Sequence, residues 1–236
     1  MPLVKFADDT AMLGLIKMDN SNLYEKQIQT FVEYCDRNYL ELNVKKTKEM
    51  VIDTRRSRRA SPAPISIKGS DVDRTNQYKY LGIMFDDELS WKAHCDYTLK
   101  KIRPRFYCFR RLNYFNVNSK ILRIFFQAVI CSVWQYCFVS WGGNARLTDL
   151  SRIQSIIRRA SRVIGECQSV DSYYRDSVGW TLNRLLGDES HPLHDVFQTA
   201  IIPRSGRMRQ PYSVTNRYHN SFVPTAIRHF NLIHDR

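Results

Sequence analysis

Cysteine pairs, internal repeats and a hydrophobic leader are all missing from this 236-residue sequence. Its six cysteines are scattered and no two form a C-x-x-C pair, so neither a zinc site nor a disulfide framework is indicated. Reduced thiols fit a nuclear or cytoplasmic protein, which is the location we expect. The absence of a repeat argues against a solenoid. The few residues before Phe6 cannot hold the apolar segment of a signal peptide, so no leader is expected.

Acidic residues are scarce beside basic ones. The chain has 23 acidic and 36 basic residues, which give a formal charge of +13 and a pI near 9.6. Such an excess favours a polyanionic partner, and we expect nucleic acid rather than an anionic membrane surface. A hydrophobic content of 43% over this length is enough for one large domain or two small ones.

One long stretch, residues 124–145, lacks any charged side chain. A membrane-spanning helix needs about 20 predominantly apolar residues. This stretch contains Gln127, Ser132 and Gln135 and ends near two glycines, Gly142 and Gly143. We therefore interpret it as a buried core helix and expect no membrane contact.

The first candidate site is the adjacent pair Asp8 and Asp9. Strand-like residues 3–6 and 11–16 flank the pair, which places it at the tip of a predicted β-hairpin. Two carboxylates on a tight turn form a hard-oxygen site for Mg²⁺ with positions left open for phosphate oxygens. The alternative is an ordinary solvated turn, and the pair alone does not decide between them.

The rest of the first ninety residues predicts a helix and further strands. Apolar residues recur at helical spacing over residues 22–38, and a loop feeds a strand that ends near residue 52. Residues 55–64 form a basic, proline-containing surface loop, either solvated or in contact with phosphate. Strand signals at 65–67 and 78–85 predict a second hairpin.

From Trp91 onward the pattern becomes helical. We predict helices over residues 91–112, with a kink at Pro104, over 119–141 and over 147–164. Beyond residue 168 the sequence is polar and irregular until a short apolar segment near the end. Two basic clusters on neighbouring helices suggest a polyanion groove, although charged helix faces are often merely solvated. The clusters are Lys100, Lys101, Arg103, Arg105, Arg110 and Arg111, then Arg152, Arg158, Arg159 and Arg162.

Several short blocks occur in an order that resembles the C-terminal part of a reverse transcriptase from a non-LTR (LINE-type) retrotransposon. They are FADD at 6–9, LNVKKTK at 42–48, YKYLG at 78–82, FRRL at 109–112, HPL at 191–193, SGR at 205–207, TNR at 215–217 and NSFVPTAIR at 220–228. The resemblance implies an α+β fold in three parts. These are a partial polymerase palm (1–88), a helical thumb-like domain (89–167) and an irregular basic C-terminal region (168–236).

The resemblance also assigns roles to residues. Asp8 matches a metal-binding carboxylate and Asp9 its neighbour, while Lys46 and Lys48 match a loop that approaches the phosphates of the incoming nucleotide. Without the resemblance, the lysines would form an exposed basic loop. Residues that match the primer-gripping hairpin and the duplex-tracking helices are Tyr80, Leu81, Gly82, Lys100, Lys101, Arg105, Arg110 and Arg111. Without it, Tyr80 and Leu81 would be core strand residues.

The resemblance implies RNA and DNA as partners, in the form of a template–primer duplex, and Mg²⁺ as cofactor. In this chemistry the metals are shared with an aspartate from an earlier palm strand, which this sequence lacks together with the fingers. We therefore expect a fragment of an RNA-directed DNA polymerase, a nucleotidyltransferase. It would be inactive alone, with Mg²⁺ bound weakly or not at all and with residual nucleic-acid binding. The alternatives are a polymerase completed by another chain and a repurposed, non-catalytic interaction or binding protein.

Overall fold

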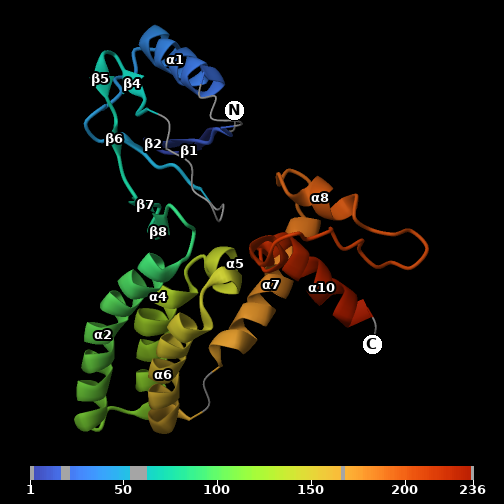
Figure 1. Ribbon diagram of the computed structural model, residues 1–236. Coiled ribbons are helices and arrows are strands. Elements are labelled where there is room, and N and C mark those ends of the chain that lie inside the picture. Colours follow the sequence, from blue (N-terminus) through green and yellow to red (C-terminus); the bar gives the residue numbers. More distant parts are fainter. Residues whose placement is uncertain (1–2, 17–21, 54–62, 166–167, 235–236) are drawn as a thin grey trace. The chain divides into compact units, whose positions relative to one another are not determined.

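The computed structural model describes residues 3–16, 22–53, 63–165 and 168–234, and it divides the chain into two compact units (Figure 1). The first unit is Met1–Leu89 and the second is Ser90–Arg236. Small sheets lie in the first and helices dominate the second, so the fold is a mixture of helix and strand, compatible with the predicted α+β class. The basic run at residues 55–59 lies outside the described residues.

The predicted N-terminal hairpin is present. β1 (Leu3–Phe6) and β2 (Asp9–Met12) form an antiparallel, two-stranded sheet in which Phe6 pairs with Asp9. The turn between them is Ala7-Asp8, and Ala7 takes a left-handed conformation with φ 53°. Asp8 therefore lies at the tip, as predicted, and Asp9 begins the second strand.

A small core holds the first unit together. The helix α1 (Asn22–Arg37) packs Ile28 and Val32 against the hairpin of β4 (Ser66–Ile67) and β5 (Ser70–Asp71). β3 (Lys48–Glu49) pairs in parallel with β6 (Asp73–Arg74), which brings together segments 25 residues apart. The remaining core residues are Ile65, Ile67 and Val72, with Met12, Tyr24, Leu42 and Val44 partly buried around them.

Residues 78–85, predicted as strand, fold back on themselves. β7 (Gln77–Tyr80) and β8 (Ile83–Asp86) pair through the two-residue turn Leu81-Gly82, whose φ angles are 45° and 86°. A two-residue hairpin turn with positive φ at both positions favours glycine at the second. Leu81 is therefore an exposed turn residue, and the reading of it as a core strand residue is wrong.

Two of the three long helices in the second unit match the prediction closely. α2 (Lys92–Tyr114) continues through Pro104, and α6 (Leu147–Ile164) has the predicted bounds. In Figure 1 these two helices run beside α4 (Ser132–Gln135). The helix α2 contacts both α4 and α6.

The remaining predicted helix, over residues 119–141, is divided into several short helices. α3 (Ser119–Phe125) continues into a π-helical turn, Phe126–Cys131, and α4, after which Cys137 takes φ 49° and α5 (Phe138–Trp141) begins. By length and composition alone the segment Ser119–Asn144 could cross a membrane, although core helices pass the same test. A third of its most apolar part is buried in the structure. The large side chains that this segment buries are Leu122, Phe126, Ile130, Trp134, Phe138 and Trp141.

The prediction of an irregular C-terminal region is wrong. α7 (Val170–Leu186) is a regular helix capped by Ser169, and α8 (His194–Gln198), α9 (Asn216–His219) and α10 (Phe222–His234) follow it. The apolar residues of α7 are spread around the helix and do not form one stripe, so its sequence pattern is weak. It forms because Val178, Leu182 and Leu185 pack into a core with residues of α8 and α10. The short terminal helix was predicted.

Close packing at Gly143 generates a stability prediction. A Cβ atom there would overlap the Tyr174 hydroxyl and the carbonyl oxygen of Asn220, so Gly143→Ala must displace backbone. We expect the free energy of unfolding of the second unit to fall by about 1–3 kcal/mol. Gly187→Ala is the control, because its nearest atom, the carbonyl oxygen of Asn183, is 3.6 Å from the added carbon. Thermal unfolding followed by circular dichroism compares the two variants, and equal melting temperatures would contradict this packing.

His94 generates a pH prediction. Burial, with a smaller contribution from Lys101, lowers the pKa of His94 from 6.5 to about 4. Between these values the unfolded chain takes up a proton that the folded chain does not, so stability falls as the pH drops from 6.5 to 4, by about 2 kcal/mol. His94→Phe should flatten this dependence, whereas His234→Gln, at an exposed position, should preserve it. Chemical unfolding measured across this pH range provides the test.

Candidate functional site

The two aspartates of the N-terminal hairpin are both exposed. Asp8 lies in the turn and Asp9 begins β2. The two carboxylates therefore come from adjacent residues, one in a turn and one in a strand. Within the described ranges, no group of three or more His, Cys, Asp or Glu side chains is arranged to hold a metal ion. Mg²⁺ is commonly held by one or two carboxylates together with waters and phosphates. The pair therefore fits part of a magnesium site, with the opposing ligand still to be supplied.

The hairpin also presents unused strand surface. β1 and β2 form a sheet of two strands, so in the part of the chain that the structure describes neither outer edge is paired. Leu3, Val4 and Phe6 are exposed apolar side chains on β1. A strand with an open edge and exposed apolar side chains is a template for pairing with another strand. The geometry thus suits a hairpin that completes a larger sheet.

Hydrogen bonds to Asn43 shape the loop of residues 42–48, here called the lysine loop. The side-chain oxygen of Asn43 accepts a hydrogen bond from the Lys46 N–H at 3.0 Å, and its carbonyl oxygen accepts one from the Thr47 hydroxyl at 2.9 Å. This turn leaves Lys45 and Lys46 exposed. Sequence reasoning missed Asn43, although its position three residues before Lys46 is a familiar signal of a side-chain-capped turn.

Lys48 differs from Lys46 because it forms an ion pair with Asp73. It begins β3, and its ammonium group lies 2.6 Å from the Asp73 carboxylate. The hydrogen bond from Lys48, with its charge, lowers the pKa of Asp73. The two lysines predicted to act together thus differ: Lys46 extends from a turn, and Lys48 joins two strands.

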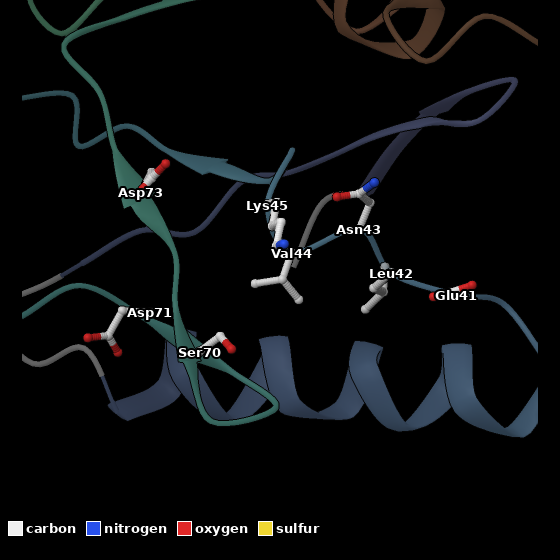
Figure 2. Close-up of a pocket in the computed structure, with 8 residues that line it drawn as sticks. All are labelled: Glu41, Leu42, Asn43, Val44, Lys45, Ser70, Asp71 and Asp73. Atoms are coloured by element: carbon white, nitrogen blue, oxygen red, sulfur yellow. The ribbon is translucent and has the colours of Figure 1, made fainter.

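A cleft of about 680 Å³ lies beside this loop (Figure 2). It is lined by residues 41–45 of the loop and by Ser70, Asp71 and Asp73 of the facing strands. The lining carries three carboxylates and one ammonium group, that of Lys45. Because like charges repel, this surface disfavours phosphate, and neither Lys46 nor Lys48 lines it. The cleft is therefore not the nucleotide site that the resemblance implies.

A buried ion pair supports the loop from the inside. Arg74 of β6 donates to one carboxylate oxygen of Glu49 from Nε at 2.9 Å and from Nη2 at 2.7 Å. The Glu49 side chain is only 4% exposed, and Arg74 also donates to the Ala63 carbonyl oxygen. Burial and then the Glu49 carboxylate raise the pKa of the neighbouring Tyr24. The pair fixes β3 against β6 and so fixes where the lysine loop ends.

The hairpin predicted to grip a primer end lies in the first unit. Tyr80 is the last residue of β7, its ring is half-buried, and its hydroxyl makes no hydrogen bond within the described structure. Leu81 and Gly82 form the exposed turn that follows. The structure therefore places these three residues at one hairpin tip, and their contact with a primer stays a prediction.

The predicted cationic residues of α2 lie on its accessible surface. Lys100, Lys101, Arg110 and Arg111 are exposed and Arg105 is half-buried. Asp96 is the only acidic residue in α2, and it accepts a hydrogen bond from Arg152 of α6 at 2.7 Å. The same Arg152 group lies 3.2 Å from Asp149. The two helices are thus neighbours, as predicted, and the one carboxylate of α2 is already neutralised.

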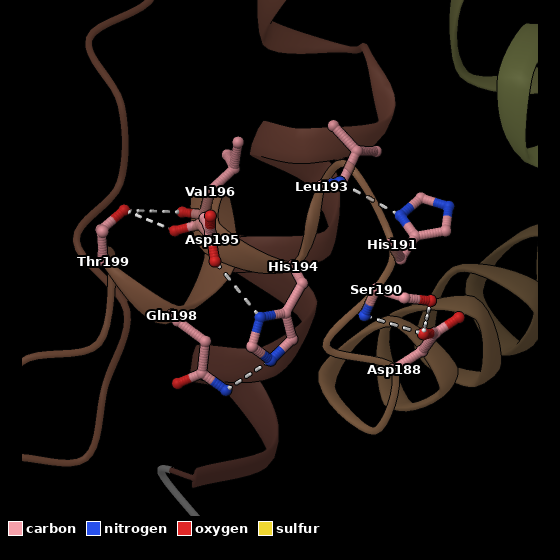
Figure 3. Close-up of polar contacts among 9 residues, drawn as sticks. All are labelled: Asp188, Ser190, His191, Leu193, His194, Asp195, Val196, Gln198 and Thr199. Carbon is pink, nitrogen blue, oxygen red and sulfur yellow. Dashed lines mark hydrogen bonds and ion pairs between the residues drawn. The ribbon is translucent and has the colours of Figure 1, made fainter.

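The C-terminal blocks, to which the sequence assigned no chemistry, have structural roles (Figure 3). His191 Nδ1 accepts a hydrogen bond from the Leu193 N–H, and Asp188 accepts two from Ser190. The Ser190 bonds lower the pKa of Asp188. These contacts shape the turn that leads into α8, whose Phe197 is fully buried.

The last two blocks hold the end of the chain. The Thr215 hydroxyl accepts a hydrogen bond from the Tyr218 N–H and so caps α9. Arg228 of α10 donates to the carbonyl oxygen of His219 at 2.8 Å. Asn231 exchanges two hydrogen bonds with the backbone of Met208. These residue types are explained by local structure.

Three curated proteins are similar in sequence to this chain. "Probable RNA-directed DNA polymerase from transposon BS" of Drosophila melanogaster is 27% identical over 91% of this chain and 23% of its own length. "Retrovirus-related Pol polyprotein from type-1 retrotransposable element R1 4" of Nasonia vitripennis is 25% identical over 71% of this chain and 47% of its own. "Probable RNA-directed DNA polymerase from transposon X-element" of Drosophila melanogaster is 22% identical over 70% and 18%.

The chain is related to the RNA-directed DNA polymerases of non-LTR retrotransposons. The resemblance inferred from the short blocks is thereby confirmed. The chain spans less than half of the length of each of these relatives. No known family model matches it, and neither does any solved structure.

The buried pair Glu49–Arg74 generates a prediction. Arg74→Met leaves the Glu49 carboxylate buried without its counter-charge, which should destabilise the first unit by about 3 kcal/mol. Hydrogen–deuterium exchange over residues 63–74 should then accelerate strongly. Asp73→Asn, which removes the neighbouring exposed pair, should change the exchange little. Replacing both members, with Glu49→Leu and Arg74→Met, should restore part of the protection, and a double variant no better than Arg74→Met would contradict this explanation.

Proposed function

We propose that this chain is part of an RNA-directed DNA polymerase of a non-LTR retrotransposon, inactive by itself and completed by a further palm segment. The observation that carries the proposal is the similarity to the probable RNA-directed DNA polymerase of transposon BS over 91% of the chain. The hairpin supports it, because Asp8 and Asp9 lie at its tip and, within the described residues, the outer edges of its two strands are unpaired. In this proposal the first unit is palm and the second is thumb with the C-terminal region.

Asp8 is proposed as a metal-binding carboxylate, with Asp9 assisting. Bound Mg²⁺ would supply activation of the primer 3′-hydroxyl and stabilisation of the departing pyrophosphate. Adjacent exposed carboxylates fit such an open site, since the phosphates of the nucleotide occupy the remaining positions. Two-metal catalysis needs a facing carboxylate as well, and none lies with this pair in the described residues. The chain alone is therefore proposed to be inactive.

Lys46 is the better of the two proposed phosphate-binding lysines. It is exposed on the turn that Asn43 organises, so its ammonium group is available to neutralise a phosphate or to protonate pyrophosphate. Lys48 is less available to a phosphate, because its ammonium group lies 2.6 Å from the Asp73 carboxylate. We therefore assign the phosphate contact to Lys46 and an ion pair within the first unit to Lys48.

The second unit is proposed to bind the backbone of an RNA–DNA template–primer duplex through Lys100, Lys101, Arg105, Arg110 and Arg111. Phosphate contacts of this kind are sequence-independent and weaken steeply with salt. The hairpin tip of Tyr80, Leu81 and Gly82 is proposed to contact the primer end. A nuclear or cytoplasmic location and the lack of membrane contact remain predictions.

Primer extension on an RNA template with Mg²⁺ tests the proposal. The full chain alone should not extend the primer, and it should do so when mixed with a polypeptide that carries the missing palm strand and fingers. Asp8→Asn should then reduce extension by about a thousandfold or more, since a metal ligand supplies several kcal/mol of transition-state stabilisation. Asp71→Asn, another exposed aspartate of the same unit, should leave extension unchanged.

Extension by the chain alone would contradict the proposal that its metal site is incomplete. Extension that survives Asp8→Asn would contradict the proposed role of Asp8 as a metal ligand. A mixture that binds duplex but never extends it would favour the second candidate function, a repurposed nucleic-acid-binding protein. The specific observation for that alternative is the exposed aspartate pair without a third ligand in the described residues.

A further inference from the structure

The outer surface of α2 carries aromatic rings as well as cations. Tyr107 and Tyr114 are 60% and 72% exposed, and Phe115, the residue that ends the helix, is 64% exposed. The inner side of the same helix buries its other large apolar residues, among them Ile102, Phe106 and Phe109. The exposed rings therefore do not belong to the core of this unit, and their exposure needs another explanation.

These rings and cations form a single stripe. Residues three, four or seven positions apart lie on one face of a helix, and Lys100, Tyr107, Arg111 and Tyr114 follow this spacing. The Arg111 guanidinium lies 5.5 Å from the centre of the Tyr114 ring and 5.0 Å from that of Phe115. The two rings meet edge-on with centres 5.5 Å apart. The end of the stripe is thus a preorganised aromatic and cationic cluster.

The charge of the helix selects an anionic partner. α2 contains seven basic residues and one acidic residue, Asp96, which is engaged by Arg152. The carbonyl groups at the C-terminal end of a helix contribute about half a negative charge. Arg110 and Arg111 outweigh this charge where the ring cluster lies. An acidic or polyanionic ligand is favoured along the whole stripe.

Among polyanions, the rings distinguish a single strand from a duplex. In a duplex the faces of the bases are stacked on one another and cannot reach a protein side chain, so duplex binding depends on contacts to phosphates, sugars and base edges. Unpaired bases stack on exposed tyrosine rings while arginine and lysine bind the phosphates, and each stacked base is worth about 1–3 kcal/mol. A solvated charged face has no need of rings 60% or more exposed among its cations.

We infer that the outer face of α2, from Lys100 to Phe115, binds an unpaired polynucleotide strand, with bases stacked on Tyr107 and Tyr114. The inference rests on the proposed nucleic-acid binding and adds single-stranded RNA or DNA, beside the duplex, as a ligand of this face. The strand lies along the helix with its phosphates against Lys100, Arg103 and Arg111. Phe115 and Arg111 support the ring of Tyr114 and hold it in place for stacking.

Fluorescence anisotropy with the full chain provides the test. The probes are a labelled, unstructured ribonucleotide strand of about 16 nucleotides, the matching deoxyribonucleotide strand and the corresponding duplex. Tyr107→Ala and Tyr114→Ala should each weaken binding of the single strands by about tenfold and leave duplex binding unchanged. The corresponding Phe variants should retain wild-type affinity because the ring remains. Tyr212→Ala is the control, since Tyr212 is a tyrosine outside α2 that is even more exposed.

The outcomes separate this inference from the function on which it rests. Duplex and single-strand binding by the wild type, with no effect of either Ala variant, would overturn the stacking face alone. Failure of the wild type to bind any probe would overturn the proposed nucleic-acid binding as well. Equal losses on duplex and single strand would also overturn the inference, because a ring that stacks on bases cannot act on a closed duplex. The RNA and DNA probes show which strand is preferred.

Discussion

The second unit depends on a cluster of aromatic rings centred on Phe138. The Phe138 ring meets Trp141 and Trp134 edge-on, with centres 4.7 Å and 5.3 Å apart, and it meets Tyr174 of α7 in the same way at 5.6 Å. Trp141 in turn packs edge-on against His94 of α2 at 4.7 Å. Edge-to-face pairs gain energy beyond the area they bury and fix ring orientation. One cluster therefore sets the mutual positions of α2, α4, α5 and α7, and it determines which side of α2 is left for a ligand.

Much of the fold follows from local sequence, and the exceptions have physical causes. The N-terminal hairpin was predicted from the strand-like residues around its aspartates, and α2 and α6 were predicted from their helical sequence patterns. The break at Cys137 could not be predicted from the neighbouring sequence. It directs Phe138 and Trp141 into an aromatic cluster whose other members, such as His94 and Tyr174, are distant in sequence. α7 was missed for the related reason that its stability comes from packing against later helices. The turn at Gly82 did have a local signal, the glycine itself.

The candidate site divides in the same way. Adjacent aspartates flanked by strands predict a hairpin tip, and the structure has it. The environment of Lys48 was not predictable, since its partner Asp73 is 25 residues away and joins it only through a parallel pairing of two short strands. The charged residue Glu49 is buried by the same pairing. The rings of α2 could have been found from sequence, because their spacing relative to Lys100 and Arg111 is helical.

The open edge of β1 has a consequence for specificity. Successive residues of a strand point to opposite sides of a sheet, so a shift of one residue in pairing turns every side chain of an added strand to the other face. Only alternate registers would then bring a given side chain of that strand to the face on which Asp8 is proposed to bind a metal ion. A strand that paired with β1 would therefore be selected by its alignment as well as by its composition. An error of a single residue would leave a well-formed sheet with its chemistry on the wrong side.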